Sequence, residues 1–494
     1  MTVDATRPVL VVGAGPTGLT AAMELARLGV DVRIVDRNPV PANTSRALGV
    51  QARTVELLRP RGVGDELLRL GTRAHRTVLY DSRRRLGAIE FGAMPSRYRS
   101  ILLLPQSQTE RLLTAQLGRH GGKVERSVEV RSLTQTADGV VAELRSADGA
   151  TEVVHAAYVI AADGAHSAIR KALGLPFAGR ALAQRYLLAD ARAHGALPSD
   201  QLTVFTAPHG FVAAFPLSGN RFRFMLTDCG EVGELTATRL QQRYDAVSPL
   251  PATMSQLEWT SEFRINSRHM ATLRAGRIFF GGDAAHIHSP AGGQGMNAGI
   301  QDMINLSWKL ALVLRGAAAP ALLDTYQTDR LPVIHRLVRF TERATRVFTS
   351  TRRPVHAVLR HVAPAVLRRR RVQCTAASVL GQVAAGYRHA DLARGGGRLG
   401  ALRAGDRLPD VSVNGSAPVS IYDHLDTAGL TLFANRTPAP DLAPWRDVVT
   451  VSPIDTDELP AGLLLVRPDG YLAAAGRRTA VLTRWLQRWF PRPV

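Results

Sequence analysis

Three glycines near the N-terminus have the spacing of a dinucleotide-binding loop. Gly13, Gly15 and Gly18 lie between an apolar run and a helical pattern. Glycine lets the backbone approach a pyrophosphate, and the helix start offers free N–H groups at its positive dipole end. Asp36 ends the next apolar run, where a carboxylate can accept a hydrogen bond from a ribose hydroxyl. The pattern predicts a site for NAD or FAD. Asp36 would repel the 2′-phosphate of NADP, although Arg37 weakens that argument.

Two further aspartates, each next to a glycine, follow apolar runs that have the character of buried strands. Asp163 follows the run 158–162, and Asp283 follows the run 276–280. In a parallel sheet, ligands bind outside the carboxyl ends of the strands, so these two ends and the glycine loop can meet on one extended cofactor. Each pair taken alone is more readily explained as a turn. Together they favour flavin, because an aspartate there can accept from a ribityl hydroxyl.

The composition excludes several classes of protein. The chain has 494 residues, with 62 Lys and Arg against 41 Asp and Glu, and a formal net charge of +21. Only three of the basic residues are lysine, which indicates a general preference for arginine and not a nucleic-acid-binding tail. A hydrophobic fraction of 45% and a charged fraction of 21% are typical of globular proteins and exclude a disordered chain. The length predicts about three domains.

Cysteine content and hydropathy predict a cytoplasmic protein. Cys229 and Cys374 are too few for a disulfide scaffold, which favours a reducing compartment. Lys309 and Arg315 interrupt the apolar stretch 306–323, so no stable membrane insertion is expected. The N-terminal apolar run is too short for a signal peptide.

One stretch, residues 336–371, holds eleven arginines and a single acid, Glu342. A groove for nucleic acid would interleave aromatic residues, and only Phe340 and Phe348 are present. The apolar positions favour an amphipathic helix with a solvated or subunit-facing side over a membrane-surface helix. We therefore expect no nucleic-acid partner, and a homodimer stays open.

The chemical groups above need elements that position them. Four strand-turn-helix units are predicted, and they start at the apolar runs 9–12, 101–104, 158–162 and 276–280. Between the third and fourth units, alternating runs such as 211–215 and 221–225 predict an antiparallel sheet. Beyond residue 405, four more apolar runs and a last helix predict a small α/β domain.

The segment 281–297 resembles the flavin-ribityl motif of the single-component (class A) FAD-dependent aromatic hydroxylases. The segment 162–170 resembles the second motif of that family, which is implicated in both FAD and NAD(P)H binding. Residues 45–54 and the dipeptide at 105–106 match as well. The resemblance covers essentially the whole chain. It extends to the aromatic polyketide hydroxylase branch, whose members carry a thioredoxin-like C-terminal domain.

The resemblance implies an α/β fold in three parts. A Rossmann-like FAD-binding domain with a helical extension comprises residues 1–175 and 275–392. An inserted antiparallel-sheet domain for substrate comprises 176–274, and a thioredoxin-like domain comprises 406–494. The last part lacks a C-x-x-C pair, so we expect a structural or dimer role and no thiol-disulfide exchange.

The helix predicted after residue 294 suits a reduced flavin. Residues 290–295 are too rich in proline and glycine to be helical, whereas the apolar residues at 296, 300, 304, 308 and 312 share one helix face. The N–H groups near Gly295, Met296 and Asn297 are therefore free and lie at the positive dipole end. They would stabilise the negative charge that reduced flavin carries at its N1/C2 carbonyl edge.

The family implies the reaction. NADPH or NADH reduces FAD, O2 adds to the flavin as a C4a-hydroperoxide, and one oxygen atom enters an electron-rich aromatic ring, expected to be that of a polycyclic polyketide. The cofactor performs the oxygen chemistry, and the protein positions it and excludes water. Baeyer-Villiger oxygenation of a related polyketide stays open, as does a non-catalytic FAD-binding or regulatory protein.

The predicted site residues follow from these motifs. The cofactor-binding residues are Gly13, Gly15, Thr17, Gly18, Asp36, Arg37, Arg46, Gln106, Asp163, Asp283, Pro290, Gly293, Gly295, Met296 and Asn297. The substrate residues, which could equally be core, are Phe211, Phe215, Phe222, Phe224, Met225 and Pro290. His286 and His288 point to opposite sides of an extended segment and lack a third ligand, so we expect structural roles and no metal. No catalytic acid or base can be named.

Overall fold

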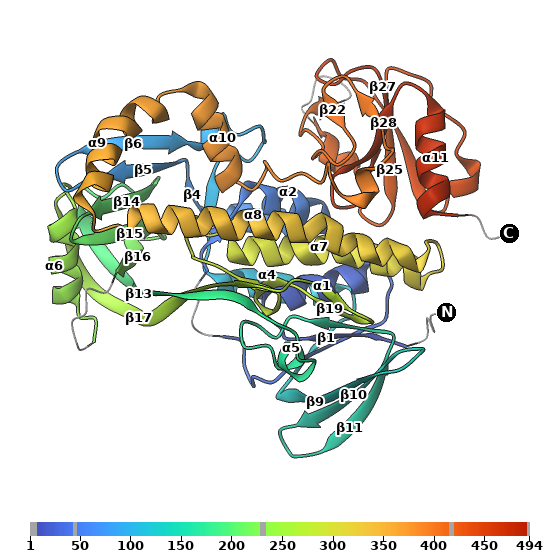
Figure 1. Cartoon of the computed structure of the whole chain (residues 1–494), viewed down its shortest axis with the longest axis horizontal. Helices are drawn as coiled ribbons and strands as arrows, with labels where there is room; N and C mark the ends of the chain where they lie inside the picture. The colour runs from blue at the N-terminus through green and yellow to red at the C-terminus, as the bar shows by residue number, and fades with distance from the viewer. Residues whose placement is uncertain (1–6, 43–46, 228–233, 414–418, 492–494) are drawn as a thin grey trace.

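The computed structural model describes residues 7–42, 47–227, 234–413 and 419–491. Figure 1 shows a parallel sheet with its helices, a large antiparallel sheet at one end of the molecule, and a small α/β unit beside two long helices. These helices are α7 (Gly295–Leu314) and α8 (Thr325–Phe348). The predicted α/β fold with an additional antiparallel sheet is confirmed.

The parallel sheet has six strands in the order β18-β19-β12-β1-β2-β8. They are β1 (Val9–Val12), β2 (Val32–Asp36), β8 (Val124–Arg126), β12 (Tyr158–Ala161), β18 (Arg274–Ala275) and β19 (Ile278–Phe280). All neighbours are parallel except β18 and β19. β1 and β12 are buried along their whole length, as expected for central strands of a sheet that is covered on both faces.

Helices and a second sheet provide this cover. On one side α1 (Pro16–Arg27) contacts both α4 (Gln106–Arg119) and α7. The antiparallel strands β9 (Val128–Gln135), β10 (Val140–Ser146) and β11 (Thr151–Ala156) extend below the parallel sheet in Figure 1. Shorter helices are α2 (Ala52–Leu58), α3 (Gly64–Leu70) and α5 (Ala168–Ala172).

The strand ends that carry the predicted chemistry lie side by side. The N–H of Ala162 donates to the carbonyl of Val12 at 2.9 Å, and the N–H of Gly281 donates to that of Ala161 at 3.3 Å. The glycine loop, Asp163 and the 281–283 turn therefore emerge together at the carboxyl edge of the sheet. This is where a doubly wound fold binds ligands.

The strand at 101–104 belongs to a different sheet. β7 (Ile101–Leu103) pairs antiparallel with β3 (Gly49–Val50) and β4 (Thr72–Ala74). The turn and helix predicted after it are present, and α4 begins at Gln106. A three-residue apolar strand carries no signal of its partner, so its sheet could not be predicted from the sequence.

The large sheet has eight strands in the order β20-β17-β13-β16-β15-β14-β5-β6, and all neighbours are antiparallel except β14 and β5, which pair parallel. They are β5 (Arg76–Tyr80), β6 (Arg85–Glu90), β13 (Ala178–Gly195), β14 (Leu202–Ala207), β15 (Gly210–Pro216), β16 (Arg221–Thr227), β17 (Ala252–His269) and β20 (His286–Ile287). The predicted hairpin of residues 211–225 is confirmed as β15 and β16. β5, β6 and β20 join this sheet from outside the stretch 176–274.

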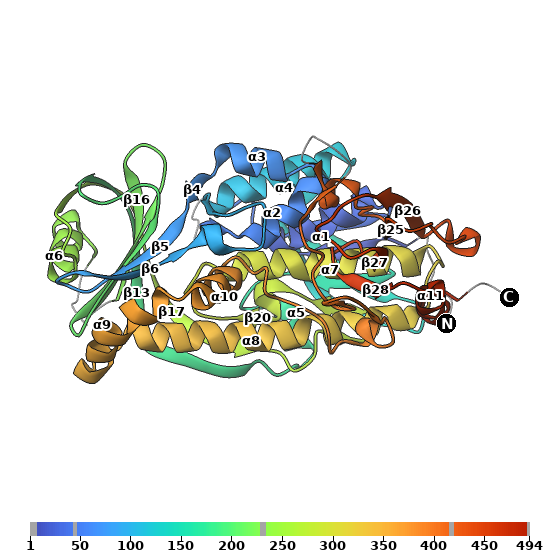
Figure 2. The same ribbon diagram turned by 90° about the horizontal axis from the view of Figure 1, so that it is seen from above.

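Helices pack on both faces of this sheet. α6 (Ala237–Val247) covers one face, and the end of α8, α9 (Arg353–Leu367) and α10 (Arg370–Leu380) lie over the other (Figure 2). The arginine-rich stretch 336–371 runs from α8 into α10, and most of its arginines are exposed. Within the part of the chain that the structure describes, no helix is both long enough and apolar enough to cross a bilayer.

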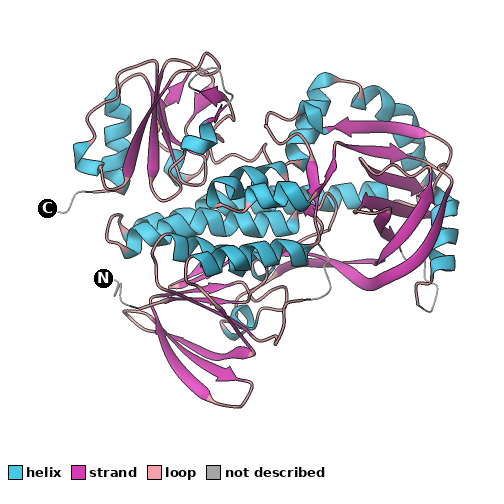
Figure 3. Ribbon diagram, turned by 180° about the vertical axis from the view of Figure 1, so that it is seen from behind, coloured by secondary structure: helices cyan, strands magenta, loops and turns pink. Residues whose placement is uncertain are grey.

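The C-terminal unit is built on a four-stranded sheet in the order β26-β25-β27-β28. These strands are β25 (Leu430–Asn435), β26 (Val449–Ile454), β27 (Gly462–Val466) and β28 (Leu472–Gly476), and α11 (Thr479–Trp489) follows. Short hairpins precede them, with β21 (Arg398–Leu399) paired to β22 (Leu402–Arg403) and β23 (Ser412–Val413) to β24 (Val419–Ser420). Figure 3 shows this unit beside the long helices.

Buried charges join the C-terminal unit to α7 and α8. Arg467, in the turn after β27, pairs with Asp329 on α8 at 2.7 Å, and Asp329 also pairs with Lys309 on α7 at 2.7 Å. Asn305 on α7 donates to Asp329 at 3.0 Å and to Asp469 at 2.7 Å. Burial alone would raise the pKa of Asp329, but Arg467 and Lys309 hold it at about 2. The carboxylate therefore stays ionised inside the protein.

Replacing Arg467 tests this connection. Arg467→Met leaves Asp329 and Asp469 buried without their shared cation, so the free energy of unfolding should fall by about 3–5 kcal/mol in denaturant titrations. Asp329 has a pKa below its unfolded value, so its contribution is present above about pH 4 and is lost toward pH 2. The variant should lose that part of the pH dependence. Arg69→Met, which removes an exposed pair with Glu66, should leave unfolding unchanged.

Candidate active site

The glycine loop is shaped by two close contacts and one open face. Gly13 has φ +100°, and a Cβ on it would lie 2.4 Å from the carbonyl oxygen of Ala162. A Cβ on Gly18 would lie 1.8 Å from the carbonyl oxygen of Gly13. A Cβ on Gly15, by contrast, would have no atom within 4 Å. Packing thus requires the first and third glycines, and the second one faces an open cleft at the start of α1.

Asp36 supports this loop from the end of β2. One carboxylate oxygen accepts from the N–H of Ala14 at 2.7 Å, and the other accepts from the N–H of Asn38 at 2.8 Å. Asp36 and the exposed Arg37 line a cleft of about 290 Å³ with Gly13 and Gly15. These two hydrogen bonds fix the orientation of the Asp36 carboxylate. Its remaining lone pairs can then accept a hydrogen bond from a ribose hydroxyl.

Asp163 and Asp283 lie at the same edge of the sheet. Asp163 accepts from the N–H of Ile169 at 3.3 Å with one oxygen. Its other oxygen is buried and has no hydrogen-bond partner among the described residues. Asp283 is exposed and lines a second cleft of about 420 Å³. Gly15, Ala162 and Gly164 line both clefts, so the two are continuous around the glycine loop.

The second cleft collects the remaining predicted cofactor residues. Thr17, Gln106, Pro290, Gly293, Gly295 and Met296 line it. Asn297 instead fastens its wall, because its side-chain amide donates to the carbonyl of Gly49 at 2.8 Å and accepts from the N–H of Gln51 at 2.8 Å. Gly18 packs α1 against the loop and does not line either cleft. Arg46 lies outside the described residues.

The 281–283 turn is held by a buried carboxylate on α7. Asp302 accepts from the N–H of Gly282 at 3.1 Å, and it pairs with His286 at 2.7 Å and with Arg330 at 2.7 Å. Burial opposes ionisation, but Arg330 and His286 hold the pKa of Asp302 below its ordinary value. His286 therefore has the structural contact expected of it. Among the described residues, no three potential ligands come together for a metal ion.

A third, almost wholly apolar cavity of about 810 Å³ lies between the eight-stranded sheet and helices α8 and α10. Phe211, Phe215, Met225 and Pro290 line it, as predicted for substrate residues. Phe215, Met225 and Pro290 also line the second cleft, so the apolar cavity adjoins it. We refer to this apolar cavity as the chamber.

Phe222 and Phe224, which the sequence offered either as substrate residues or as core, do not line the chamber and pack in a core cluster. They point to the opposite face of β16, where Phe224 packs edge-on against Tyr244 of α6 at 6.3 Å between ring centroids. Successive side chains of a strand alternate between faces. Arg223 and Met225 therefore face the site, and the alternation within 221–225 is the signal that could have separated the two sets.

Arg223 is a further residue of the site that the sequence did not indicate. Its guanidinium pairs with Asp190 through two bonds of 2.7 and 2.8 Å and lies over the ring of Trp259, and the residue lines the second cleft. The chamber wall contributed by α8 and α10, which includes Phe348 and Val379, was not predicted either. No local pattern links those helices to the sheet.

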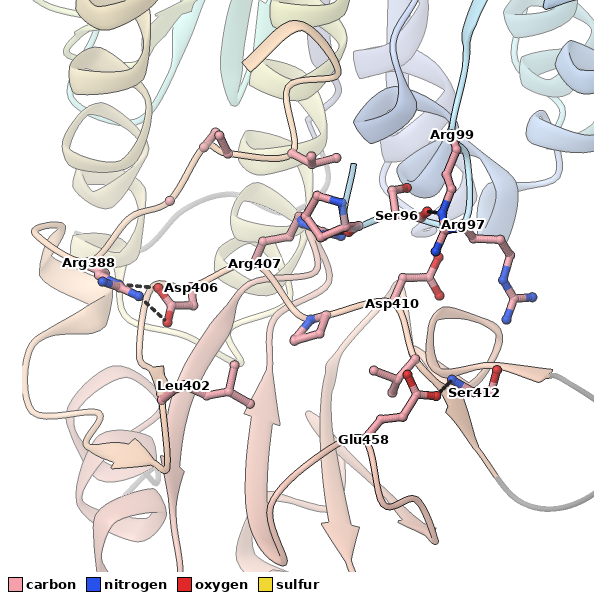
Figure 4. Close-up of a pocket in the computed structure, with 18 of the residues that line it drawn as sticks. Ser96, Arg97, Arg99, Arg388, Leu402, Asp406, Arg407, Asp410, Ser412 and Glu458 are labelled. Atoms are coloured by element: carbon pink, nitrogen blue, oxygen red, sulfur yellow. Dashed lines mark hydrogen bonds and ion pairs between the residues drawn. The ribbon is translucent and has the colours of Figure 1, made fainter. Parts of the chain in front are cut away.

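A larger groove of about 1270 Å³ lies elsewhere, between the loop 95–99, the segment 383–389 and the C-terminal unit (Figure 4). Two ion pairs lie along it, between Arg388 and Asp406 and between Arg407 and Glu56. It shares no lining residue with the clefts or the chamber. It therefore lies outside the site assembled by the sheet edge.

A Rossmann-like sheet edge with two joined clefts defines a dinucleotide-binding protein, and the adjoining apolar chamber offers room for a second, apolar ligand. The model of the family "FAD binding domain" matches residues 6–341, and that of "Aromatic-ring hydroxylase, C-terminal" matches residues 402–493. The chain belongs to this family and is an FAD-dependent aromatic monooxygenase. Enzymes of the family typically use NAD(P)H and O2. The resemblance drawn from segments 162–170 and 281–297 is confirmed.

Relatives and solved structures agree with this assignment. The chain is 35% identical to 6-methylpretetramide 4-monooxygenase of Streptomyces rimosus, over 97% of the chain and 93% of the relative. It is 34% identical to the anhydrotetracycline monooxygenase of the same organism, over 98% and 99%. The aromatic hydroxylase CabE from angucycline biosynthesis has a similar structure, with a TM-score of 0.81 and 31% sequence identity. The match covers 99% of the present chain and 100% of CabE.

The glycine loop separates folding from cofactor binding. Gly15→Ala adds a methyl group to open space, so the apoprotein should unfold at an unchanged temperature while its FAD affinity, followed by flavin fluorescence, falls about tenfold or more, or about 1.4 kcal/mol. Gly18→Ala should lower the unfolding temperature itself, because its Cβ would overlap Gly13. Equal FAD affinity in Gly15→Ala and the wild type would contradict the role assigned to Gly15.

Proposed function

We propose that this enzyme inserts one atom of O2 into a polycyclic, polyketide-type aromatic substrate bound in the chamber. The observation that carries the proposal is an apolar volume of about 810 Å³ that adjoins the second cleft and shares the lining residues Phe215, Met225 and Pro290 with it. Drug-sized ligands occupy pockets of about 300–1,000 Å³. The names of the relatives, which act on a pretetramide and on anhydrotetracycline, support a substrate of several fused rings.

We infer that FAD lies along the two joined clefts. The unpartnered oxygen of Asp163, the open face of Gly15 and the buried, unpartnered amide oxygen of Gln51 fit a polar ligand that passes through both. Asp36 and Arg37 would hold the adenosine end, and Asp163 and Asp283 the middle. The ring system would lie against Gly293, Gly295 and Met296, with Thr17, Gln106 and Pro290 completing the cleft wall.

FAD held by these residues would supply the redox chemistry, passing electrons from NAD(P)H to O2, from which the inserted oxygen atom comes. The chain itself contributes positioning, charge and exclusion of water. Gly295 and Met296, the first residues of α7, line the cleft, and the N–H groups at a helix start favour negative charge nearby. The turn from Pro290 to Gly293 separates the cleft from the chamber and can set how closely the substrate approaches the ring.

Two residues of the arginine-rich stretch give the chamber a polar rim. Arg343 of α8 and Arg371 of α10 line the chamber, whose other walls are mostly apolar. We propose that these guanidiniums meet the enolate or phenolate oxygens at the edge of a polyphenolic substrate. Such contacts would orient the ring system without placing a charge inside the apolar volume.

Turnover with candidate substrates tests the proposed function. Purified enzyme loaded with FAD should consume O2 and oxidise NADPH or NADH faster when a polycyclic phenol is added. Mass spectrometry should find a product heavier by one oxygen atom, and NMR should place it on the ring as a hydroxyl. Bound FAD with no product from any aromatic polyketide would overturn the proposal, and an inserted ester oxygen would reassign it to Baeyer-Villiger chemistry.

Filling the chamber should separate substrate binding from flavin binding. Ala213 is buried and lines the chamber from β15, so Ala213→Phe should raise the substrate KM by about tenfold or more through steric exclusion, and leave FAD affinity unchanged. Phe222→Leu, on the opposite face of the same sheet, serves as the matched control. It should lower stability modestly while the substrate KM stays at the wild-type value.

A further inference from the structure

His288 has a buried ring nitrogen, Nε2, in the second cleft. Its Nδ1 lies 2.8 Å from the carbonyl oxygen of Ser289. A carbonyl oxygen only accepts, so Nδ1 holds the hydrogen and Nε2 of the neutral ring is an acceptor. This Nε2 is buried and has no hydrogen-bond partner among the described residues. A buried acceptor without a donor is costly to keep, which makes it a candidate to meet a ligand.

The place of this atom is specific. His288 lines the second cleft together with Gly293, Gly295 and Met296. Nε2 is the nearest atom to the position that a Cβ on Gly295 would take, at 3.6 Å. The imidazole edge therefore lies beside the first residue of α7, where the proposed function puts the pyrimidine edge of the flavin.

The surroundings keep His288 neutral as long as the cleft gains no negative charge. Burial, and secondarily the charge of His286, lowers the pKa of His288 to about 4, although its bond to Ser289 opposes the shift. His286 itself is held by Asp302, which Arg330 also contacts.

Other charged groups also face this region. Arg223, paired with Asp190, and the exposed Asp283 line the same cleft. Arg268 lies opposite Ile287 where β17 pairs with β20, and Arg343 lies on α8, whose Thr345 contacts Ser289. Solvent screens the charge of Asp283 because the residue is exposed, so the anion of a reduced flavin would be the main new charge beside the imidazole.

We propose that His288 takes up a proton when the bound flavin is reduced and then donates Nε2–H to the negatively charged edge of the ring. The inference rests on the proposed function. A nicotinamide delivers two electrons and one proton as hydride, which leaves a negative charge at the N1/C2 edge. The additional proton comes from solvent to Nε2, and it returns to solvent when the flavin is reoxidised. Protonated His288 thus balances the negative charge of the reduced flavin. It acts as a hydrogen-bond donor in addition to the N–H groups at the start of α7.

The physical reason is the change in charge beside the ring. An opposite charge within hydrogen-bond distance favours the protonated imidazole, and the buried setting strengthens the attraction. The oxidised flavin carries no such charge, so the neutral ring is retained. Reduction and protonation therefore support each other by linkage.

The test is the pH dependence of the flavin midpoint potential in the FAD-loaded enzyme, measured by equilibration with a redox dye between about pH 7 and pH 8.5. We expect the wild type to take up two protons for two electrons. His288→Gln keeps an N–H donor but cannot titrate, and His288→Leu removes both functions. Both variants should take up one proton, and His288→Leu should bind reduced FAD less tightly relative to oxidised FAD than His288→Gln does.

Two controls separate proton uptake by His288 from protonation of the flavin or of another imidazole. The absorption spectrum of the reduced enzyme should be that of the flavin anion, because a neutral reduced flavin would also take up two protons. His335→Gln, an imidazole on α8 outside the cleft, should leave the proton count at two. A wild-type count of one overturns the inference and leaves the proposed function intact. Loss of FAD binding or of oxygen transfer in the wild type would instead overturn the proposed function.

Discussion

The need to keep two buried carboxylates of the helical layer paired governs much of this structure. On α7, Asp302 accepts a hydrogen bond from Gly282 and pairs with His286 and Arg330. On α8, Asp329 forms ion pairs with Lys309 and Arg467. An ionised carboxylate without partners in such a place would cost more than the fold can tolerate. Each partner is therefore fixed in place. These contacts fix the positions of the 281–283 turn, α7, α8 and the C-terminal unit relative to one another.

The same constraint involves the C-terminal unit, whose sequence lacks a C-x-x-C pair. Asp469 contacts Asn305 of α7, the helix that begins beside the cleft, and Arg467 contacts Asp329 of α8. The C-terminal unit thus contributes cations and acceptors to the core of the flavin domain.

Polar and apolar parts of the site are separated by the turn 290–293. On one side, aspartates, backbone N–H groups and His288 suit a charged cofactor. On the other side, the chamber presents almost only apolar atoms, with Arg343 and Arg371 at its rim. This division suits a reaction in which a reduced, charged ring and an aromatic substrate meet away from water.

The sequence by itself determined the sheet edge. The spacing of Gly13, Gly15 and Gly18 and the strand before them act within one strand-turn-helix unit, where local backbone rules suffice. The family resemblance also rested on contiguous segments. Only the tertiary structure decided which faces meet. Phe222 and Phe224 lie in the core under α6, and β5 and β6 belong to the large sheet. Helices α8 and α10 form a wall of the chamber. Side chains from distant segments share a cavity only through long-range packing, and a single sequence carries no local signal for it.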